Sequence, residues 1–213
     1  MRGAVYIDGF NLYHAVDDIG VPHLKWCNFW ELARLITKGH AKTLEKVVFC
    51  TAYFPGMPGK RSRHEMFVRA LDLVGVETRL GHVAKESVTC KLAECEFTWW
   101  QPTEKATDIN LSLAIIEDAM DNVFDIAFLV TADTDQVATI NSFRKRFPEK
   151  RIFIVSPPGR QPSEHLDRIA HGKVRLKERH FHQTLLPAVV TAAGKNSVAR
   201  PTEYDPPFGE AVV

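Results

Sequence analysis

The sequence predicts an α/β fold in which helices flank a mostly parallel central sheet of about five strands. Short apolar runs rich in β-forming residues alternate along the chain with segments of helical period, as in strands joined by crossover helices. The run at residues 126–130 (IAFLV) is continuously apolar, which is typical of a strand covered on both faces. Two of the runs end in polar residues, at Asp8 and Asp133, and ligands of open α/β sheets bind at such strand ends.

The first half of the chain is predicted to contain three strands separated by helices. A short helix follows the first strand, and residues 29–37 have helical spacing with Asn28 placed to cap them. A third helix begins in a basic segment near Lys60 and ends at Gly75, a helix-terminating residue. The three predicted strands are residues 4–8, 47–53 and 76–83.

The second half is predicted to add two strands and three helices. Residues 84–103 have no clear periodicity, and we interpret them as an insertion or β-excursion. The strongest helical pattern covers residues 103–120, and residues 174–186 are ambiguous. The remaining predicted elements are a strand at 126–130, a helix at 134–147, a strand at 151–156 and a short helix at 163–171.

The composition predicts one folded domain followed by a tail. From Pro187 onward the chain is rich in Ala, Pro, Gly and polar residues and has little to bury. We therefore expect a domain at residues 1–186 and a flexible C-terminal tail at 187–213, which is a candidate segment for binding a protein.

Composition also narrows the classes of function. The formal net charge of +1 provides no overall field for a polyanion, so contact with nucleic acid would depend on local basic clusters. No apolar run reaches the length of a membrane span, and we expect no membrane partner. Four cysteines without a secretory signal indicate free thiols in a cytoplasmic protein. The composition leaves open whether the chain forms a homo-oligomer.

Acidic residues mark three places in the predicted fold. Asp8 ends the first strand, Asp133 and Asp135 follow the strand at 126–130, and Asp108 lies in the first turn of a helix. If the first and fourth strands are parallel neighbours, these carboxylates share one edge of the sheet. Neighbouring carboxylates raise one another's pKa, and a divalent cation such as Mg²⁺ or Mn²⁺ removes that cost. The alternative is that each acid caps a helix, as Asp133 would for the following one.

Three segments resemble, in order and spacing, the signatures of NYN domains, which belong to the PIN-like nuclease superfamily and include the LabA/DUF88 group. They are residues 7–13 (IDGFNLY), 104–110 (EKATDIN) and 131–135 (TADTD). The resemblance covers about residues 3–180. It implies a metal-dependent ribonuclease on a PIN-like three-layer fold.

The resemblance assigns roles to individual positions. The implied catalytic and metal-binding set is Asp8, Asp108, Asp133 and Asp135. Asn11 matches the family's site asparagine, and Thr131 stands where a serine usually supports the site. The departures from the pattern are Ala106 and Ala132 in place of glycines and Gln136 in place of an aromatic residue. They put rate and substrate access in doubt more than metal binding.

A nuclease also needs cationic contacts to the phosphate backbone. Basic residues follow the Pro/Gly loop after the second strand, close to the expected site, and Lys105 precedes Asp108. The candidate substrate-binding residues are Asn11, Thr131, Lys60, Arg61, Arg63 and Lys105. The other interpretation is that the basic cluster is a solvated helix face.

Two weaker signals lie in the predicted insertion. Cys90 and Cys95 have a C-x₄-C spacing with His82 upstream, but a zinc site usually needs two close ligand pairs, so we favour ordinary thiols. Trp99 and Trp100 are candidates for base stacking, although covering the sheet edge is the favoured role.

The leading hypothesis is a metal-dependent endoribonuclease that uses one or two Mg²⁺ or Mn²⁺ ions to hydrolyse RNA. One alternative is a non-catalytic RNA-binding or regulatory module on the same fold. Another is a haloacid-dehalogenase-like phosphatase, since residues 133–137 (DTDQV) fit a D-x-D-x-[TV] nucleophile motif with Asp133 as nucleophile. That motif normally follows the first strand of its domain, and Asp8 and Asp108 would have no role.

Overall fold

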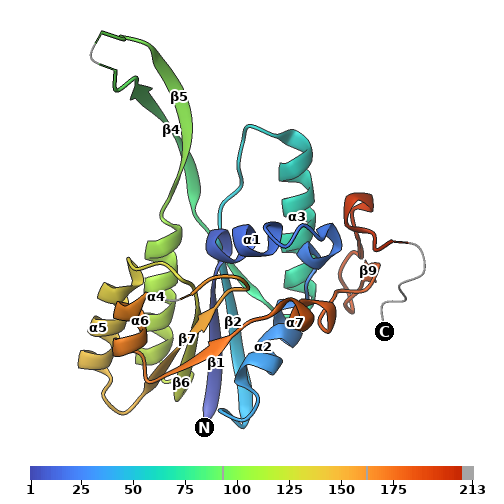
Figure 1. The fold of residues 1–213 in the computed structure, drawn as a ribbon. Helices are drawn as coiled ribbons and strands as arrows, with labels where there is room; N and C mark the ends of the chain where they lie inside the picture. The colour runs from blue at the N-terminus through green and yellow to red at the C-terminus, as the bar shows by residue number, and fades with distance from the viewer. Residues whose placement is uncertain (93, 162, 208–213) are drawn as a thin grey trace.

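A computed structural model describes the chain except residues 93, 162 and 208–213. Its centre is a six-stranded sheet in which every strand pair is parallel, with helices on both faces (Figure 1). This confirms the predicted α/β class and adds a strand to the expected number. In spatial order the strands are β3 (Glu77–Leu80), β2 (Thr43–Thr51), β1 (Arg2–Asp8), β6 (Ile126–Val130), β7 (Arg151–Ser156) and β8 (Gly172–Arg175).

The extra strand, β8, lies at one edge of the sheet beside β7. It falls where the sequence predicts only the end of a helix and an ambiguous segment. Within its four residues Val174 is the single large apolar side chain and none is fully buried, so an apolar pattern could not reveal it. Its strand character comes from pairing with β7, a contact that local sequence does not encode.

Helices cover both faces of the sheet and create two hydrophobic clusters. Asn28 caps the second helix as expected, because its side chain accepts hydrogen bonds from the backbone N–H groups of Trp30 and Glu31. The helices are α1 (Gly9–Asp17), α2 (Phe29–Thr37), α3 (Pro58–Leu73), α4 (Thr107–Met120), α5 (Gln136–Arg146), α6 (Glu164–Ile169) and α7 (Glu178–His182), with 3₁₀ turns η1 (Pro22–Lys25) and η2 (Thr202–Tyr204).

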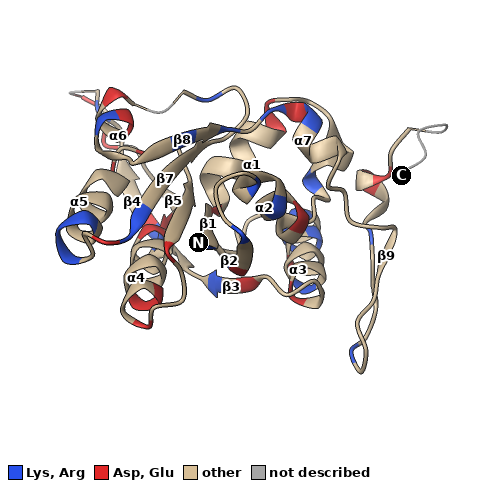
Figure 2. Ribbon diagram, turned by 90° about the horizontal axis from the view of Figure 1, so that it is seen from below, with Lys and Arg blue, Asp and Glu red and all other residues tan. Residues whose placement is uncertain are grey.

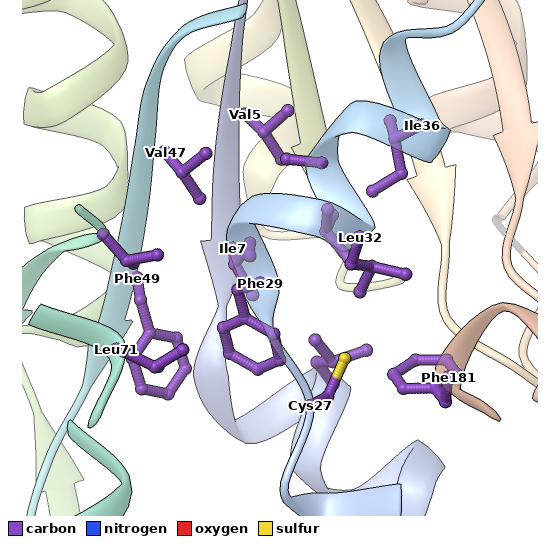
Figure 3. Close-up of a cluster of buried hydrophobic side chains, with 14 of the residues drawn as sticks. Val5, Ile7, Cys27, Phe29, Leu32, Ile36, Val47, Phe49, Leu71 and Phe181 are labelled. Atoms are coloured by element: carbon purple, nitrogen blue, oxygen red, sulfur yellow. The ribbon is translucent and has the colours of Figure 1, made fainter. Parts of the chain in front are cut away.

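Successive side chains of β1 point to opposite faces of the sheet, and each face has its own hydrophobic cluster. Val5 and Ile7 pack into the cluster formed with α1, α2, α3 and α7, where Leu32 of α2 is also buried (Figure 3). Ala4 and Tyr6 point to the other face and join the cluster formed with α4, α5 and α6. Because β1 is buried on both faces and lies at the centre of the sheet, the residue that follows its last apolar position is held firmly in place.

Residues 82–89 and 98–105 pair as an antiparallel hairpin that extends away from the sheet (Figure 1). Its strands are β4 (His82–Thr89) and β5 (Thr98–Lys105). The β-excursion is therefore present, and the helix predicted from residue 103 begins instead at Thr107, because residues 98–105 pair with β4. Trp99 and Trp100 belong to β5, in a two-stranded sheet that extends away from the central one, and they are 41% and 70% exposed, so the favoured role of covering the sheet edge is wrong.

Part of the segment predicted to be a flexible tail, within residues 187–207, contacts the preceding domain. Trp26 Nε1 donates a hydrogen bond to the carbonyl of Pro187 at 2.9 Å. Val190 of β9 (Val189–Val190) is buried, and Glu203 forms a 2.6 Å ion pair with Arg63 of α3. These contacts join residues more than a hundred positions apart, so composition could not predict them. Residues 208–213 lie outside the described part of the chain.

Acidic and basic residues are interspersed along the chain, in keeping with the net charge of +1 (Figure 2). Three consecutive basic residues, 144–146, form the last turn of α5. Within the described residues, no helix combines the length and the apolar character that crossing a bilayer requires.

Candidate active site at the carboxyl edge of the sheet

The site begins where the strand order of the sheet reverses. Strands β1 and β6 are parallel neighbours with Ile7 opposite Val130, which confirms the adjacency that the sequence hypothesis requires. Chain connections leave β1 and β6 in opposite directions across the sheet, and such a reversal leaves a crevice at the carboxyl ends of the strands. The residues that follow these two strands meet directly: Thr131 Oγ1 donates a hydrogen bond to Asp8 Oδ2 at 2.9 Å.

Asp8 is fixed by the turn from β1 into α1. It is the N-cap of α1, and its Oδ1 accepts a hydrogen bond from the backbone N–H of Asn11 at 3.0 Å. Gly9 follows because a Cβ at this position would lie 2.4 Å from the carbonyl oxygen of Cys50. The capping interpretation is therefore correct for Asp8, but capping uses one carboxylate oxygen, and the side chain also faces a cavity.

The loop after β6 is held by two residues of the first and third motifs. Asn11 Oδ1 accepts the backbone N–H of Ala132 at 3.1 Å, and Thr131 Oγ1 accepts that of Asp133 at 3.0 Å. Asp133 Oδ1 in turn accepts the backbone N–H of Asp135 at 2.9 Å. Asn11 and Thr131, expected at the substrate, thus fix the loop that carries Asp133.

Three of the four predicted aspartates line one cavity of about 510 Å³. Asp8 comes from the end of β1, Asp108 from the first turn of α4, and Asp133 from the loop after β6. Asp135 is exposed and is not part of the lining. Glu104 is an acidic lining residue that sequence reasoning missed, although it belongs to the quoted EKATDIN segment. We call this cavity the acidic cavity.

The carboxylates of the acidic cavity destabilise one another's charge. Burial raises the pKa of Asp8 to about 6, and the negative charges of Asp108 and Asp133 add to the rise. Burial also raises the pKa of Asp108, with further contributions from Asp133, Glu104 and Asp135. This electrostatic strain is what the sequence predicts for acids that converge, and such strain is common at functional sites.

Gln136 is a second residue that sequence reasoning missed. It is buried at the start of α5, its hydrogen bond to Asp108 opposes the rise in the pKa of that carboxylate, and its Oε1 accepts a hydrogen bond from Ser112. The sequence marked this position only as a departure from an aromatic residue. In the structure it orients an acid of the cavity.

Ala106, which replaces a glycine of the family pattern, has a strained backbone conformation. Ala106 precedes α4 with φ of 73°, in the left-handed region that favours glycine, whereas Ala132 has no positive φ. A non-glycine residue in this region costs about 1–2 kcal/mol.

We expect Ala106→Gly to leave the free energy of unfolding unchanged or to raise it by up to about 1 kcal/mol, since relieved strain exceeds the added entropy of the unfolded chain. Ala138→Gly, at an exposed position inside α5, should instead lower it by about 1 kcal/mol. Urea denaturation of both variants measures the contrast. An equal loss of stability in both would show that Ala106 is not strained.

The donor chemistry of the acidic cavity fits a hard divalent cation, because carboxylate oxygens are the ligands that Mg²⁺ and Mn²⁺ prefer. Within the described residues, no three His, Cys, Asp or Glu side chains already form a metal-binding group, so the four predicted aspartates do not make a ready cage. Mg²⁺ usually takes only one or two carboxylates and keeps water or substrate phosphate in its other positions. The residues present satisfy that smaller requirement.

The four predicted cations lie outside the acidic cavity. Lys60 and Arg61 line a neighbouring cavity, Arg63 pairs with Glu203, and Lys105 pairs with Glu86 at 2.7 Å. The cation that does line the acidic cavity is Arg160, which also pairs with Asp18. Arg160 lies in a segment that the sequence marked only as a break after a strand.

The cysteine pair and the histidine upstream of it lie at opposite ends of the hairpin. Cys90 and Cys95 are free thiols at the end of the hairpin, whereas His82 lies at its base opposite Lys105. The length of the strands therefore separates His82 from the two thiols. Among the described residues, no group of three or more His, Cys, Asp or Glu side chains suited to a metal is found there, and the interpretation as ordinary thiols stays a prediction.

Comparison with known proteins gives three findings. A family model described as "NYN domain" matches residues 2–174. The chain is 26% identical over 207 residues to 6-hydroxy-3-succinoylpyridine 3-monooxygenase HspA of Pseudomonas putida, covering 81% of this chain. It spans 66% of that relative, just under two thirds of its length.

The third finding concerns solved structures. The fold is similar to that of VPA0982, a protein of unknown function from Vibrio parahaemolyticus, with a TM-score of 0.52 and 20% identity. That match covers 87% of this chain and 96% of the other, and at this identity it bears on the fold alone.

Proposed function

The chain belongs to the NYN domain family, a PIN-like nuclease family, and on that premise we propose that it is a metal-dependent endoribonuclease. The observation that carries the proposal is the acidic cavity, in which carboxylates from three separate segments meet at the switch point of the sheet. Helix capping alone would not bring Asp8, Asp108 and Asp133 together. The nuclease domain in this proposal is residues 1–186, and the partner is RNA.

The proposal gives each residue of the cavity a task. One or two of the carboxylates of Asp8, Asp108 and Asp133 would hold Mg²⁺ or Mn²⁺, and the others, with Asp135 outside the lining, would add negative charge. When bound, such a cation polarises a phosphoryl oxygen and promotes attack by water. Thr131 orients the Asp8 carboxylate through its hydrogen bond. Arg160, which lines the same cavity, would contact a phosphate once it gives up its ion pair with Asp18.

The basic residues predicted to contact RNA would do so outside the acidic cavity. Lys60 and Arg61 would meet the strand beyond the acidic cavity, on the lining of its neighbour. Arg63 and Lys105 would have to give up their ion pairs with Glu203 and Glu86 to reach phosphate. Exposed ion pairs contribute only about 0–1 kcal/mol, so such an exchange is energetically accessible.

The test is cleavage of labelled single-stranded and structured RNA by the purified chain with Mn²⁺. We expect the wild type to cleave RNA and a chelator to abolish the cleavage. Asp108→Asn should slow cleavage at least about tenfold, since even the loss of a group that only orients a metal ligand has an effect of that size. The matched control is Asp167→Asn, an acid of α6 that pairs with Lys173 outside the cavity and should leave the rate unchanged. If the wild type cleaves no RNA but binds it, the non-catalytic alternative replaces this proposal.

A second candidate function follows from the similarity to HspA, whose name describes a monooxygenase acting on 6-hydroxy-3-succinoylpyridine. The identity of 26% extends over most of this chain, which favours testing the same class of chemistry. The measurement is oxygen consumption with a hydroxypyridine carboxylate and a reduced nicotinamide. We expect none if the acidic cavity serves phosphodiester hydrolysis, and sustained consumption would put the oxygenase candidate first.

A further inference from the structure

A second cavity, of about 180 Å³, lies on the other side of the first turn of α1. It is enclosed by α1, the end of β2, α3 and the C-terminal turn η2. Its walls are largely aromatic, and we call it the aromatic cavity. The aromatic side chains that matter here are Phe10, Tyr13, Phe49, Phe54, Phe67 and Tyr204.

From this geometry we infer that the aromatic cavity binds a planar nitrogen heterocycle that carries an anionic group. The base of a nucleotide and a free pyridine carboxylate share that chemistry. The inference deepens the proposed function, because a nucleotide base in this cavity would make it a subsite for RNA.

Size and shape favour a single flat ring system. The volume is below the range of about 300–1,000 Å³ that drug-sized ligands occupy. Phe10 and Phe54 meet edge to face with ring centroids 5.6 Å apart, so the wall presents both ring faces and ring edges. Aromatic walls of this kind stabilise a stacked base by about 1–3 kcal/mol.

The wall also contains a neutral polar pair suited to a ring nitrogen. His64 Nε2 and Thr51 Oγ1 lie 3.2 Å apart at hydrogen-bond distance. Burial lowers the pKa of His64 to about 4, so the imidazole is neutral at physiological pH. A neutral imidazole and a hydroxyl can each donate or accept a hydrogen bond, which suits the mixed edge of a heterocycle.

Three cationic side chains line this cavity, and two of them already form ion pairs with carboxylates. Lys25 pairs with Asp17, and Arg61 pairs with Glu65 at 2.7 Å. The ammonium of Lys60 lies 4.8 Å from the centre of the Tyr13 ring. No ion pair to Lys60 is found in the part of the chain that the structure describes. The ammonium of Lys25 also lies over this ring, at 5.4 Å from its centre. A heterocycle that stacks on Tyr13 would therefore displace Lys60 from the ring, and the displaced ammonium would pair with the anionic group of the ligand.

The two cavities share part of their lining. Phe10 and His14 of α1 line both, so only the first turns of this helix separate them. An RNA strand that places a base in the aromatic cavity would cross the start of α1 and present a neighbouring phosphate to the acidic cavity. The arrangement couples base capture to the proposed site of cleavage.

The test is a calorimetric titration of the full chain without divalent metal, using uridine and adenosine 5′-monophosphates, pyridine-3-carboxylate and ribose 5-phosphate. We expect saturable binding of the ring compounds and none of ribose 5-phosphate. Tyr13→Ala and Lys60→Ala should each weaken binding about tenfold, while Arg69→Ala, exposed on the same helix as Lys60 and outside the lining, should not. Thermal melts show whether each variant is folded.

The outcomes separate this inference from the proposed function. Tighter binding of the nucleotides identifies RNA as the source of the ring, and tighter binding of pyridine-3-carboxylate identifies a free small molecule. The inference is overturned if ribose 5-phosphate binds as well as the nucleotides, or if Tyr13→Ala and Lys60→Ala, both folded, bind like the wild type. RNA cleavage without nucleotide binding would remove this subsite and leave the nuclease proposal standing, whereas binding without cleavage supports the ring site alone.

Discussion

Asp133→Asn is expected to lower the rate of RNA cleavage at least about 100-fold, the loss typical of removing a group that stabilises transition-state charge. The reason is that Asp133 lines the acidic cavity beside Asp8, and asparagine removes its negative charge. The fold should be kept, since the amide oxygen can still accept the backbone N–H of Asp135. Initial rates with labelled RNA and Mn²⁺ measure the effect.

The matched control for that experiment is Asp135→Asn, two residues along the same loop. Asp135 is exposed and outside the lining, so we expect a loss of less than about tenfold, which reflects only a longer-range interaction with Asp108. Equal rates for wild type and Asp133→Asn would contradict the account. A greater loss from Asp135→Asn than from Asp133→Asn would mean that the cavity is not the reactive centre.

Asp8→Asn is expected to stabilise the metal-free protein at neutral pH, because the pKa of Asp8 is raised from 3.8 to about 6. The folded state therefore holds the proton more tightly than the unfolded state, and the stability of the wild type falls as the pH rises from about 4 to about 6. Above that window the buried charge costs on the order of 3 kcal/mol. Asparagine carries no charge, so the variant avoids this cost.

The measurement is urea denaturation without divalent ions at about pH 7.5 and about pH 4. Asp8→Asn should be more stable than the wild type by about 1–3 kcal/mol at the higher pH and by less than about 1 kcal/mol at the lower. Added Mn²⁺ should stabilise the wild type more than the variant, because it binds the folded state. A variant that is less stable at both pH values would show that the hydrogen bonds of Asp8 to Asn11 and Thr131 outweigh its charge.

Sequence patterns predicted the parts of the fold that depend on neighbouring residues. The apolar run of β6 and the polar end of β1 led to the expectation that Asp8, Asp133 and Asp135 share one edge if the two strands are parallel neighbours, and the pairing of the strands confirms that adjacency. The start of α4 was wrong because residues before Thr107 pair across a hairpin, and β8 was missed because it is an edge strand with one apolar residue. Both depend on partners distant in sequence.

The same distinction applies to the site. The motifs in the sequence predicted that Asp108 belongs to the site. They could not predict that Gln136 forms a hydrogen bond with Asp108 or that Glu104 also lines the cavity, because those contacts depend on how α4 packs against the following elements. Nor could composition show that Tyr204, from the predicted tail, forms a wall of the aromatic cavity. Ion pairs such as Arg63 with Glu203 connect segments 140 residues apart.

The most direct test of the central claim, that the acidic cavity is a divalent-metal site for RNA hydrolysis, is anomalous X-ray scattering from Mn²⁺ in crystals near neutral pH. The account predicts a Mn²⁺ peak within coordination distance of carboxylate oxygens of Asp8, Asp108 or Asp133. It also predicts that the peak is lost in Asp133→Asn. A cavity without a peak, at a Mn²⁺ concentration that supports RNA cleavage in solution, would contradict it.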